Sequence, residues 1–94
     1  MLSITPVKLK KVKKENIDKE ILRLGILAEL DAINLYEQMA AMSTSKDLQK
    51  VLLEIAKEEK TRVGEFQALL LRADKEQKKE LEEGKREVEE LIGK

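Results

Sequence analysis

Apolar residues recur at helical spacing along two long stretches of the chain and along a shorter, highly charged stretch after them. This pattern predicts helices at about 17–42, 46–72 and 74–92. The composition agrees, because charged residues make up 40% of the 94 positions, aromatic residues make up 2%, and there are four Gly and one Pro. We therefore expect a single all-α domain, an antiparallel helical hairpin followed by a short C-terminal helix.

Small polar residues mark where these helices begin. Asn16 or Asp18 is expected to cap the first helix, Ser45 the second and Asp74 the third. Such side chains accept hydrogen bonds from the free N–H groups of a first helical turn. The resulting division of the chain has three parts: a basic, flexible leader (1–15), the helical hairpin (16–73) and a charged C-terminal helix for assembly or contact with a shell (74–94).

Each of the first two helices carries a heptad-spaced apolar seam that is interrupted by charge at its centre. Both helices also carry a second apolar row, which a two-helix hairpin cannot cover as well. A four-helix bundle made from two hairpins is the expected solution, so the chain is predicted to dimerise. The predicted seams are Leu22, Ile26, Glu29, Ile33, Tyr36 and Ala40 in the first helix, and Leu48, Leu52, Ile55, Glu59, Arg62, Phe66 and Leu69 in the second.

The charged residues of the two seams are expected to lie at one level of the hairpin. Glu29 and Glu59 are symmetric about the turn between the helices, at about 20 Å from it, and Arg62 lies one turn beyond Glu59. A buried carboxylate requires a cation or a hydrogen-bonding network. The spacing leaves two interpretations open: a metal site built from Glu residues of facing helices, or a metal-free core in which Arg62 neutralises both carboxylates.

Charge and composition exclude several other functions. Lys and Arg total 19 and balance 19 Asp and Glu, so no net field attracts nucleic acid or an anionic membrane. The chain has no Cys and no His, which excludes disulfides and thiolate sites and removes the commonest metal ligand. No apolar run reaches the ~20 residues of a membrane span, and no signal-peptide core is visible. We therefore expect a cytoplasmic protein that binds neither nucleic acid nor membrane.

Two segments resemble the metal-binding half-motifs of ferritin-like proteins. Residues 29–36, ELDAINLY, have the form E-x-x-A-x-x-x-Y of the first metal-binding helix in rubrerythrins and their relatives. Residues 55–62, IAKEEKTR, are similar to the second half-motif, I-A-x-x-E-x-x-H. The resemblance is strongest to the encapsulated ferritins and extends over about residues 20–93.

The resemblance implies both an activity and an assembly. Hairpins of this family dimerise into a ferritin-like four-helix bundle around a di-iron centre and assemble further into an open ring. The centre oxidises Fe(II) with dioxygen or peroxide, and an encapsulin shell around the ring stores the iron. By this resemblance Glu29 and Glu59 are iron ligands, and Tyr36 is a hydrogen-bonding group beside them. Asp31 stands where relatives place acidic residues along the path of incoming iron.

The chain departs from the family pattern at Arg62, which stands where the His ligand is expected. A guanidinium group is permanently charged and has no lone pair to offer, so it cannot coordinate iron and competes with it for the carboxylates. The resemblance therefore implies a ferroxidase-type protein with impaired iron binding and oxidation. The alternative is a metal-free structural or assembly protein with a Glu–Arg salt-bridged core.

Overall fold

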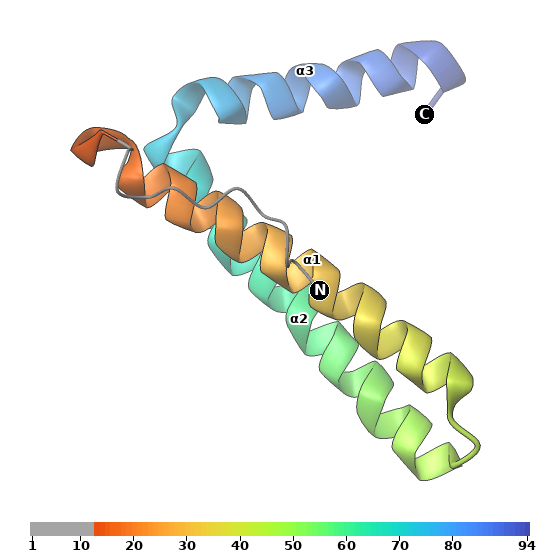
Figure 1. The fold of residues 1–94 in the computed structure, drawn as a ribbon. Helices are drawn as coiled ribbons and strands as arrows, with labels where there is room; N and C mark the ends of the chain where they lie inside the picture. Colours follow the sequence, from red (N-terminus) through yellow and green to blue (C-terminus); the bar gives the residue numbers. More distant parts are fainter. Residues whose placement is uncertain (1–12) are drawn as a thin grey trace.

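The computed structural model describes residues 13–94, so most of the basic leader predicted at 1–15 lies outside the described residues. A short 3₁₀ turn, η2 (Lys14–Asn16), leads into α1 (Ile17–Met42), α2 (Lys46–Ala73) and α3 (Lys75–Ile92). Helices α1 and α2 lie side by side as an antiparallel hairpin, and α3 leaves the end of α2 in a different direction (Figure 1). The all-α prediction is confirmed, and the helix bounds agree with it to within one residue.

Two of the three predicted helix caps are confirmed. Ser45 Oγ accepts a hydrogen bond from the Leu48 N–H at 3.2 Å, and Asp74 Oδ1 accepts one from the Gln77 N–H at 3.0 Å. Asn16 does occupy the N-cap position of α1, but its side chain makes no capping hydrogen bond there. The preceding 3₁₀ turn uses backbone bonds instead, since the Asn16 N–H donates to the Lys13 carbonyl at 2.9 Å.

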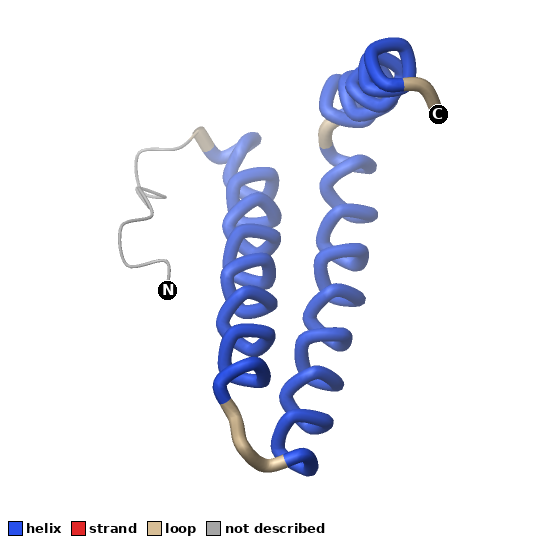
Figure 2. Tube along the Cα trace, turned by 90° about the vertical axis from the view of Figure 1, so that its right-hand side faces the viewer, coloured by secondary structure: helices blue, strands red, loops and turns tan. Residues whose placement is uncertain are grey.

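A compact turn joins α1 to α2 and sets the antiparallel direction of the hairpin. Ser43 Oγ accepts a hydrogen bond from the Ser45 N–H at 3.1 Å. The Gln49 side chain donates to the Ser43 carbonyl at 2.6 Å, which ties the first turn of α2 to the end of α1. The two helices then run alongside each other for their full length (Figure 2).

The interface between α1 and α2 forms the core of the described chain. In α1 every position of the predicted seam is at least partly covered, so that prediction is confirmed. In α2 the prediction was wrong by one residue over part of the helix, because Leu48, Arg62 and Leu69 are exposed. The two apolar rows of α2 are adjacent, and packing against α1 selects the row with the smaller residue at its middle. The seam observed in α2 is Leu52, Ala56, Glu59, Val63, Phe66 and Leu70.

The helices approach closely where Gly25 meets Phe66. A Cβ atom added to Gly25 would lie 3.1 Å from Cε2 of the Phe66 ring. At Gly64, on the same helix as Phe66, a Cβ atom would have no atom within 4 Å apart from its chain neighbours and the backbone of its own helix. Gly25 therefore makes room for the only Phe of the chain, whereas Gly64 serves no such packing role.

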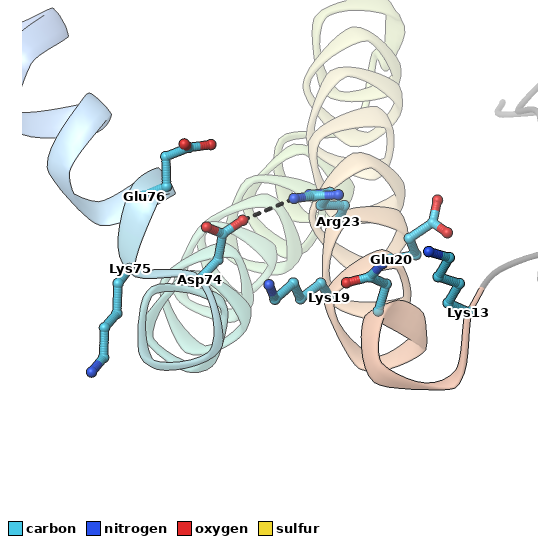
Figure 3. Close-up of a pocket in the computed structure, with 8 residues that line it drawn as sticks. Lys13, Lys19, Glu20, Arg23, Asp74, Lys75 and Glu76 are labelled. Atoms are coloured by element: carbon cyan, nitrogen blue, oxygen red, sulfur yellow. Dashed lines mark hydrogen bonds and ion pairs between the residues drawn. The ribbon is translucent and has the colours of Figure 1, made fainter.

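Asp74 connects the base of α3 to the hairpin. Its Oδ2 accepts a hydrogen bond from Arg23 Nη2 of α1 at 2.9 Å (Figure 3). Its Oδ1 caps α3. The Gln77 N–H is the largest cause that lowers the pKa of Asp74. Burial opposes this effect, and Arg23 and Lys19 add to it. The sequence alone carried no sign of this pair, because 51 residues separate its members.

Beyond this junction α3 has no buried residue. Within residues 13–94, no helix is long and apolar enough to cross a membrane. The charged C-terminal helix is thus attached to the rest of the described chain only at its base.

We predict that two Gly→Ala substitutions change the free energy of unfolding differently. Gly64→Ala should raise the free energy of unfolding by about 0.5–1 kcal/mol, because Ala favours a helix and the position is open. Gly25→Ala should gain less or lose stability, because its new methyl group contacts the Phe66 ring. Chemical denaturation of both variants measures the difference. Combining Gly25→Ala with Phe66→Leu should recover the gain, and equal effects of the two Ala substitutions would contradict the close approach.

The Asp74 carboxylate should make the stability of the chain pH-dependent. Its pKa is lowered in the folded state from an ordinary value of 3.8, so its stabilising effect is complete above that pH and is lost as the pH falls further. The advantage of the parent over Asp74→Asn in free energy of unfolding should therefore shrink in acid. Denaturation curves at neutral and acidic pH test this, with Glu76→Gln as a neighbouring control. If the difference in free energy of unfolding between the parent and Asp74→Asn stays constant from neutral to acidic pH, Asp74 does not cause this pH dependence.

Candidate metal centre

Glu29 and Glu59 face the interior of the hairpin at its middle. Glu29 lies in the α1 seam between Ile26 and Ile33, and Glu59 lies in the α2 seam between Ala56 and Val63. Only 15% of the Glu59 side chain is exposed. The structure thus keeps both carboxylates on the seam, where the sequence placed them.

Glu29 holds an unsatisfied oxygen. Its Oε2 is buried and has no hydrogen-bond partner among the described residues. Buried polar atoms are nearly always paired, and an unpaired carboxylate oxygen costs more than a neutral one. The missing partner is therefore a cation or a hydrogen-bond donor that residues 13–94 of one chain do not supply.

Glu59 already has a cationic partner. Arg62 Nη1 donates to Glu59 Oε1 at 2.7 Å, one turn away on the same helix. The Arg62 side chain is 46% exposed, so the guanidinium lies on the flank of α2. The prediction that Arg62 sits in the hairpin seam was wrong. Val63 takes that place, and its apolar side chain next to Arg62 was the signal in the sequence.

The other two predicted site residues, Tyr36 and Asp31, do not lie beside Glu29. Tyr36 is farther along the helix, and Asp31 is on another face of it. Tyr36 is partly covered in the α1 seam, about 10 Å along the helix from Glu29. Asp31 is two residues beyond Glu29, and at about 100° per residue it faces the other side of α1. Neither residue adds a third ligand beside Glu29 and Glu59 within one chain.

Residues 13–94 of one chain do not supply a complete metal site. Among residues 13–94 no group of three or more His, Cys, Asp or Glu side chains is arranged to hold a metal ion. The carboxylates of Glu29 and Glu59 suit a hard divalent cation, but two of them leave most of its coordination positions unfilled. A fit to iron therefore depends on further ligands from outside the chain.

An apolar surface lies on the same side of the hairpin as Arg62. Helical spacing places two rows of exposed large apolar side chains there, one from each helix. Met39 and Leu48 of these rows line one shallow groove near the turn, while Lys60 and Glu37 form a 3.0 Å ion pair on the opposite side. The exposed members of the rows are Ile21, Leu35 and Met39 in α1, and Leu48, Val51 and Leu69 in α2.

The unpaired Glu29 oxygen leads to a prediction about stability without metal. Glu29→Gln should raise the free energy of unfolding of the metal-free protein by about 1 kcal/mol, because it removes a buried charge at constant shape. Denaturation in the presence of a chelator measures the change, with the exposed Glu54→Gln as the control. A loss of stability in Glu29→Gln greater than in the control would show that the chain satisfies this charge by itself.

No protein-family model matches the chain. A curated protein of Pyrococcus furiosus, described as a ferritin-like-encapsulin shell fusion protein, is 56% identical over 96 residues, which cover 99% of this chain and 28% of that protein. The crystal structure of the encapsulated ferritin domain from Pyrococcus furiosus matches with a TM-score of 0.86 and 53% identity. That match covers 100% of this chain and 98% of the other. The chain therefore belongs to the encapsulated ferritin family and has its ferritin-like helical fold.

Proposed function

We propose that the chain is an iron-binding subunit of the ferroxidase type, whose site is completed when two hairpins dimerise. The observation that carries this proposal is the buried Glu29 Oε2 without a partner. It lies in the seam opposite the helix that carries Glu59, and next to it the hairpin exposes an apolar face. A second copy against that face would bury the apolar rows and bring two further carboxylates to the same level.

Iron is the substrate of the proposed site. Four Glu side chains, two from each copy, would offer oxygen ligands of the kind that bind iron in carboxylate-rich helical bundles. Fe(II) would give up one electron per ion to dioxygen or peroxide, and the ferric product would leave for storage. The role of the protein in this reaction is to hold the ions together and to exclude surrounding water.

The remaining predicted residues act around these ligands. Tyr36 is proposed to hydrogen-bond a ligand carboxylate of the second copy, because about 10 Å of helix separates it from its own Glu29. Asp31 is proposed to attract incoming Fe(II) on the outer side of α1. Neither role requires a contact within a single chain.

Arg62 reduces the affinity of this site for iron. Two Arg and four Glu in the dimer leave a formal charge of about −2, against about −4 if neutral His residues stood there. Each ion must also displace the Arg62 guanidinium from Glu59. In the structure Arg62 Nη1 lies 2.7 Å from Glu59 Oε1. The exposed position of the guanidinium gives it room to swing outward. We therefore propose a ferroxidase that is weaker than one with His at this position.

The compartment that we propose is based on the description of a relative of the chain. The Pyrococcus furiosus protein is by description fused to an encapsulin shell, and the chain spans only 28% of its length. We propose that this chain likewise acts inside an encapsulin shell in the cytoplasm, fused to it or packaged within it. There its dimers would assemble into a larger ring-like homo-oligomer, which places iron oxidation beside the storage space.

A metal-free structural protein is the second candidate. The Arg62–Glu59 ion pair supports it, because this pair already satisfies one of the two carboxylates of each chain. In a dimer, Arg62 of one copy could also reach Glu29 of the other. The core would then be held by charge pairs, and the protein would act in assembly alone.

Restoring His at position 62 separates these two functions. Arg62→His should raise iron binding and the rate of aerobic Fe(II) oxidation by about tenfold or more, because it removes a competing cation and adds a ligand. Arg62→Gln should give a smaller rise, because it only removes the cation. Iron content by elemental analysis and the growth of ferric absorbance measure both effects.

The controls assign the effect to the site. Adding Glu29→Ala to the Arg62→His variant should return the oxidation rate to that of protein-free buffer. If Arg62→His binds no iron, the proposed site is wrong. If the parent binds no iron and Arg62→Gln weakens its dimer, the structural function replaces the ferroxidase.

A further inference from the structure

Helix α3 exposes an apolar stripe that nothing in the described chain covers. Leu81 and Val88 are 43% and 54% exposed, and Leu91 and Ile92 at the end of the helix are 85% and 75% exposed. At about 100° per residue these four side chains share one face of α3. A solvated helix that carries such a stripe is expected to pack it against a partner.

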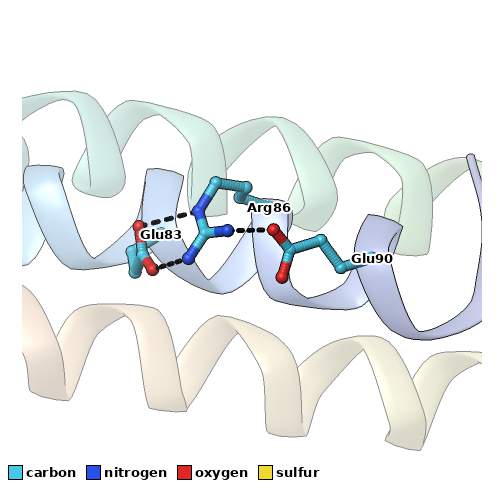
Figure 4. A network of polar contacts seen from close by, with 3 residues as sticks. All are labelled: Glu83, Arg86 and Glu90. Carbon is cyan, nitrogen blue, oxygen red and sulfur yellow. Dashed lines mark hydrogen bonds and ion pairs between the residues drawn. The ribbon is translucent and has the colours of Figure 1, made fainter.

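The charges on the last two turns of α3, which we call the α3 tip (residues 87–92), have a distinct arrangement. Glu87 and Glu89 stand on the two sides of Val88 and so flank the apolar stripe. On the opposite face Arg86 bridges Glu83 and Glu90, which ties up these carboxylates within the helix (Figure 4). The tip thus presents an apolar ridge with a carboxylate on either side.

A groove with the complementary character lies where α2 passes into α3. It has a volume of about 610 Å³ and is lined by Ala68, Leu71, Arg72, Lys75 and Lys78. Two of these side chains are apolar and three are cations, with no carboxylate among the lining residues. We call this the elbow groove.

We propose that the α3 tip of one copy docks in the elbow groove of a second copy. The apolar ridge would cover Ala68 and Leu71, while Glu87 and Glu89 would approach Lys75 and Lys78. A chain cannot make this contact with itself, because α3 is one continuous helix of 18 residues that holds its tip about 25 Å from its base. The occupant is therefore another copy of the chain.

The contact uses surfaces other than those of the proposed dimer. Tip and groove are different surfaces, so two copies can exchange their tips reciprocally about a two-fold axis, or each copy can dock on the next in a head-to-tail series. The dimer through the apolar face of α1 and α2 uses neither surface. Docking of the α3 tip therefore goes beyond the proposed iron site and does not require iron.

A charge exchange tests this contact. In Lys75→Glu/Lys78→Glu the groove loses its positive charge, and in Glu87→Lys/Glu89→Lys the tip loses its negative charge. Each variant should weaken assembly beyond the dimer by about tenfold or more in dissociation constant, because like charges then face each other. The variant that carries all four substitutions should recover assembly, because opposite charges face each other again. Native mass spectrometry and light scattering across a dilution series measure the effect.

The controls separate this contact from general effects of charge. Lys50→Glu/Lys57→Glu makes the same charge change on the exposed outer side of α2 and should assemble as the parent does. Leu91→Ser/Ile92→Ser should weaken assembly without changing net charge. Assembly that is unaffected by either charge reversal, that is not recovered in the fourfold variant, or that is absent from the parent would overturn the proposal. The Arg62→His measurements on the dimer remain informative in each case.

Discussion

The structure depends on one geometric constraint, which is that a two-helix hairpin can cover only one face of each helix. Helices α1 and α2 bury one row of side chains each, and the smallest residues of those rows set how closely they approach. Ala40 and Ala56 are nearly inaccessible to solvent, while large apolar side chains on the neighbouring face stay exposed. Within residues 13–94 no further element covers that face, since α3 contributes no buried residue. This uncovered apolar face is the basis of the dimer that we propose.

The same constraint determines the chemistry of the charged level. Glu29 and Glu59 lie within the covered rows, where a carboxylate needs a partner, and Arg62 lies at the border between the covered and exposed faces. From that border Arg62 reaches Glu59 along its own helix but leaves Glu29 Oε2 unpaired. A site half satisfied within the chain and half open to a partner can accept a metal ion or a second guanidinium. The two functions that we propose differ in which of these cations fills the site.

The direction of α3 depends on a different interaction. Asp74 caps the helix with one oxygen and binds Arg23 of α1 with the other, so a single side chain ends the hairpin and fixes the next helix to it. This junction also forms the elbow groove, because it brings Arg72 of α2 beside the lysines that begin α3. The groove proposed for further assembly thus lies at the junction itself, at the end of the hairpin that is farther from its turn.

Much of this organisation could be predicted from the sequence. Periodicity and capping residues placed the three helices, and heptad spacing placed Glu29 and Glu59 in the covered rows of the hairpin. The two half-motifs indicated the family. These features are local or follow from the regular rise of a helix, so they need no knowledge of tertiary contacts.

Other features were decided only by the tertiary structure. Two apolar rows of α2 lie one residue apart, and periodicity alone could not choose between them. Packing against α1 chose the row with Ala56 and Val63, which left Arg62 on the flank. The Arg23–Asp74 pair and the elbow groove likewise join residues distant in sequence or on different helices. The sequence thus determined the elements and their charged centre, whereas close packing determined which side chains face inward, because that choice depends on the shape of the opposing helix.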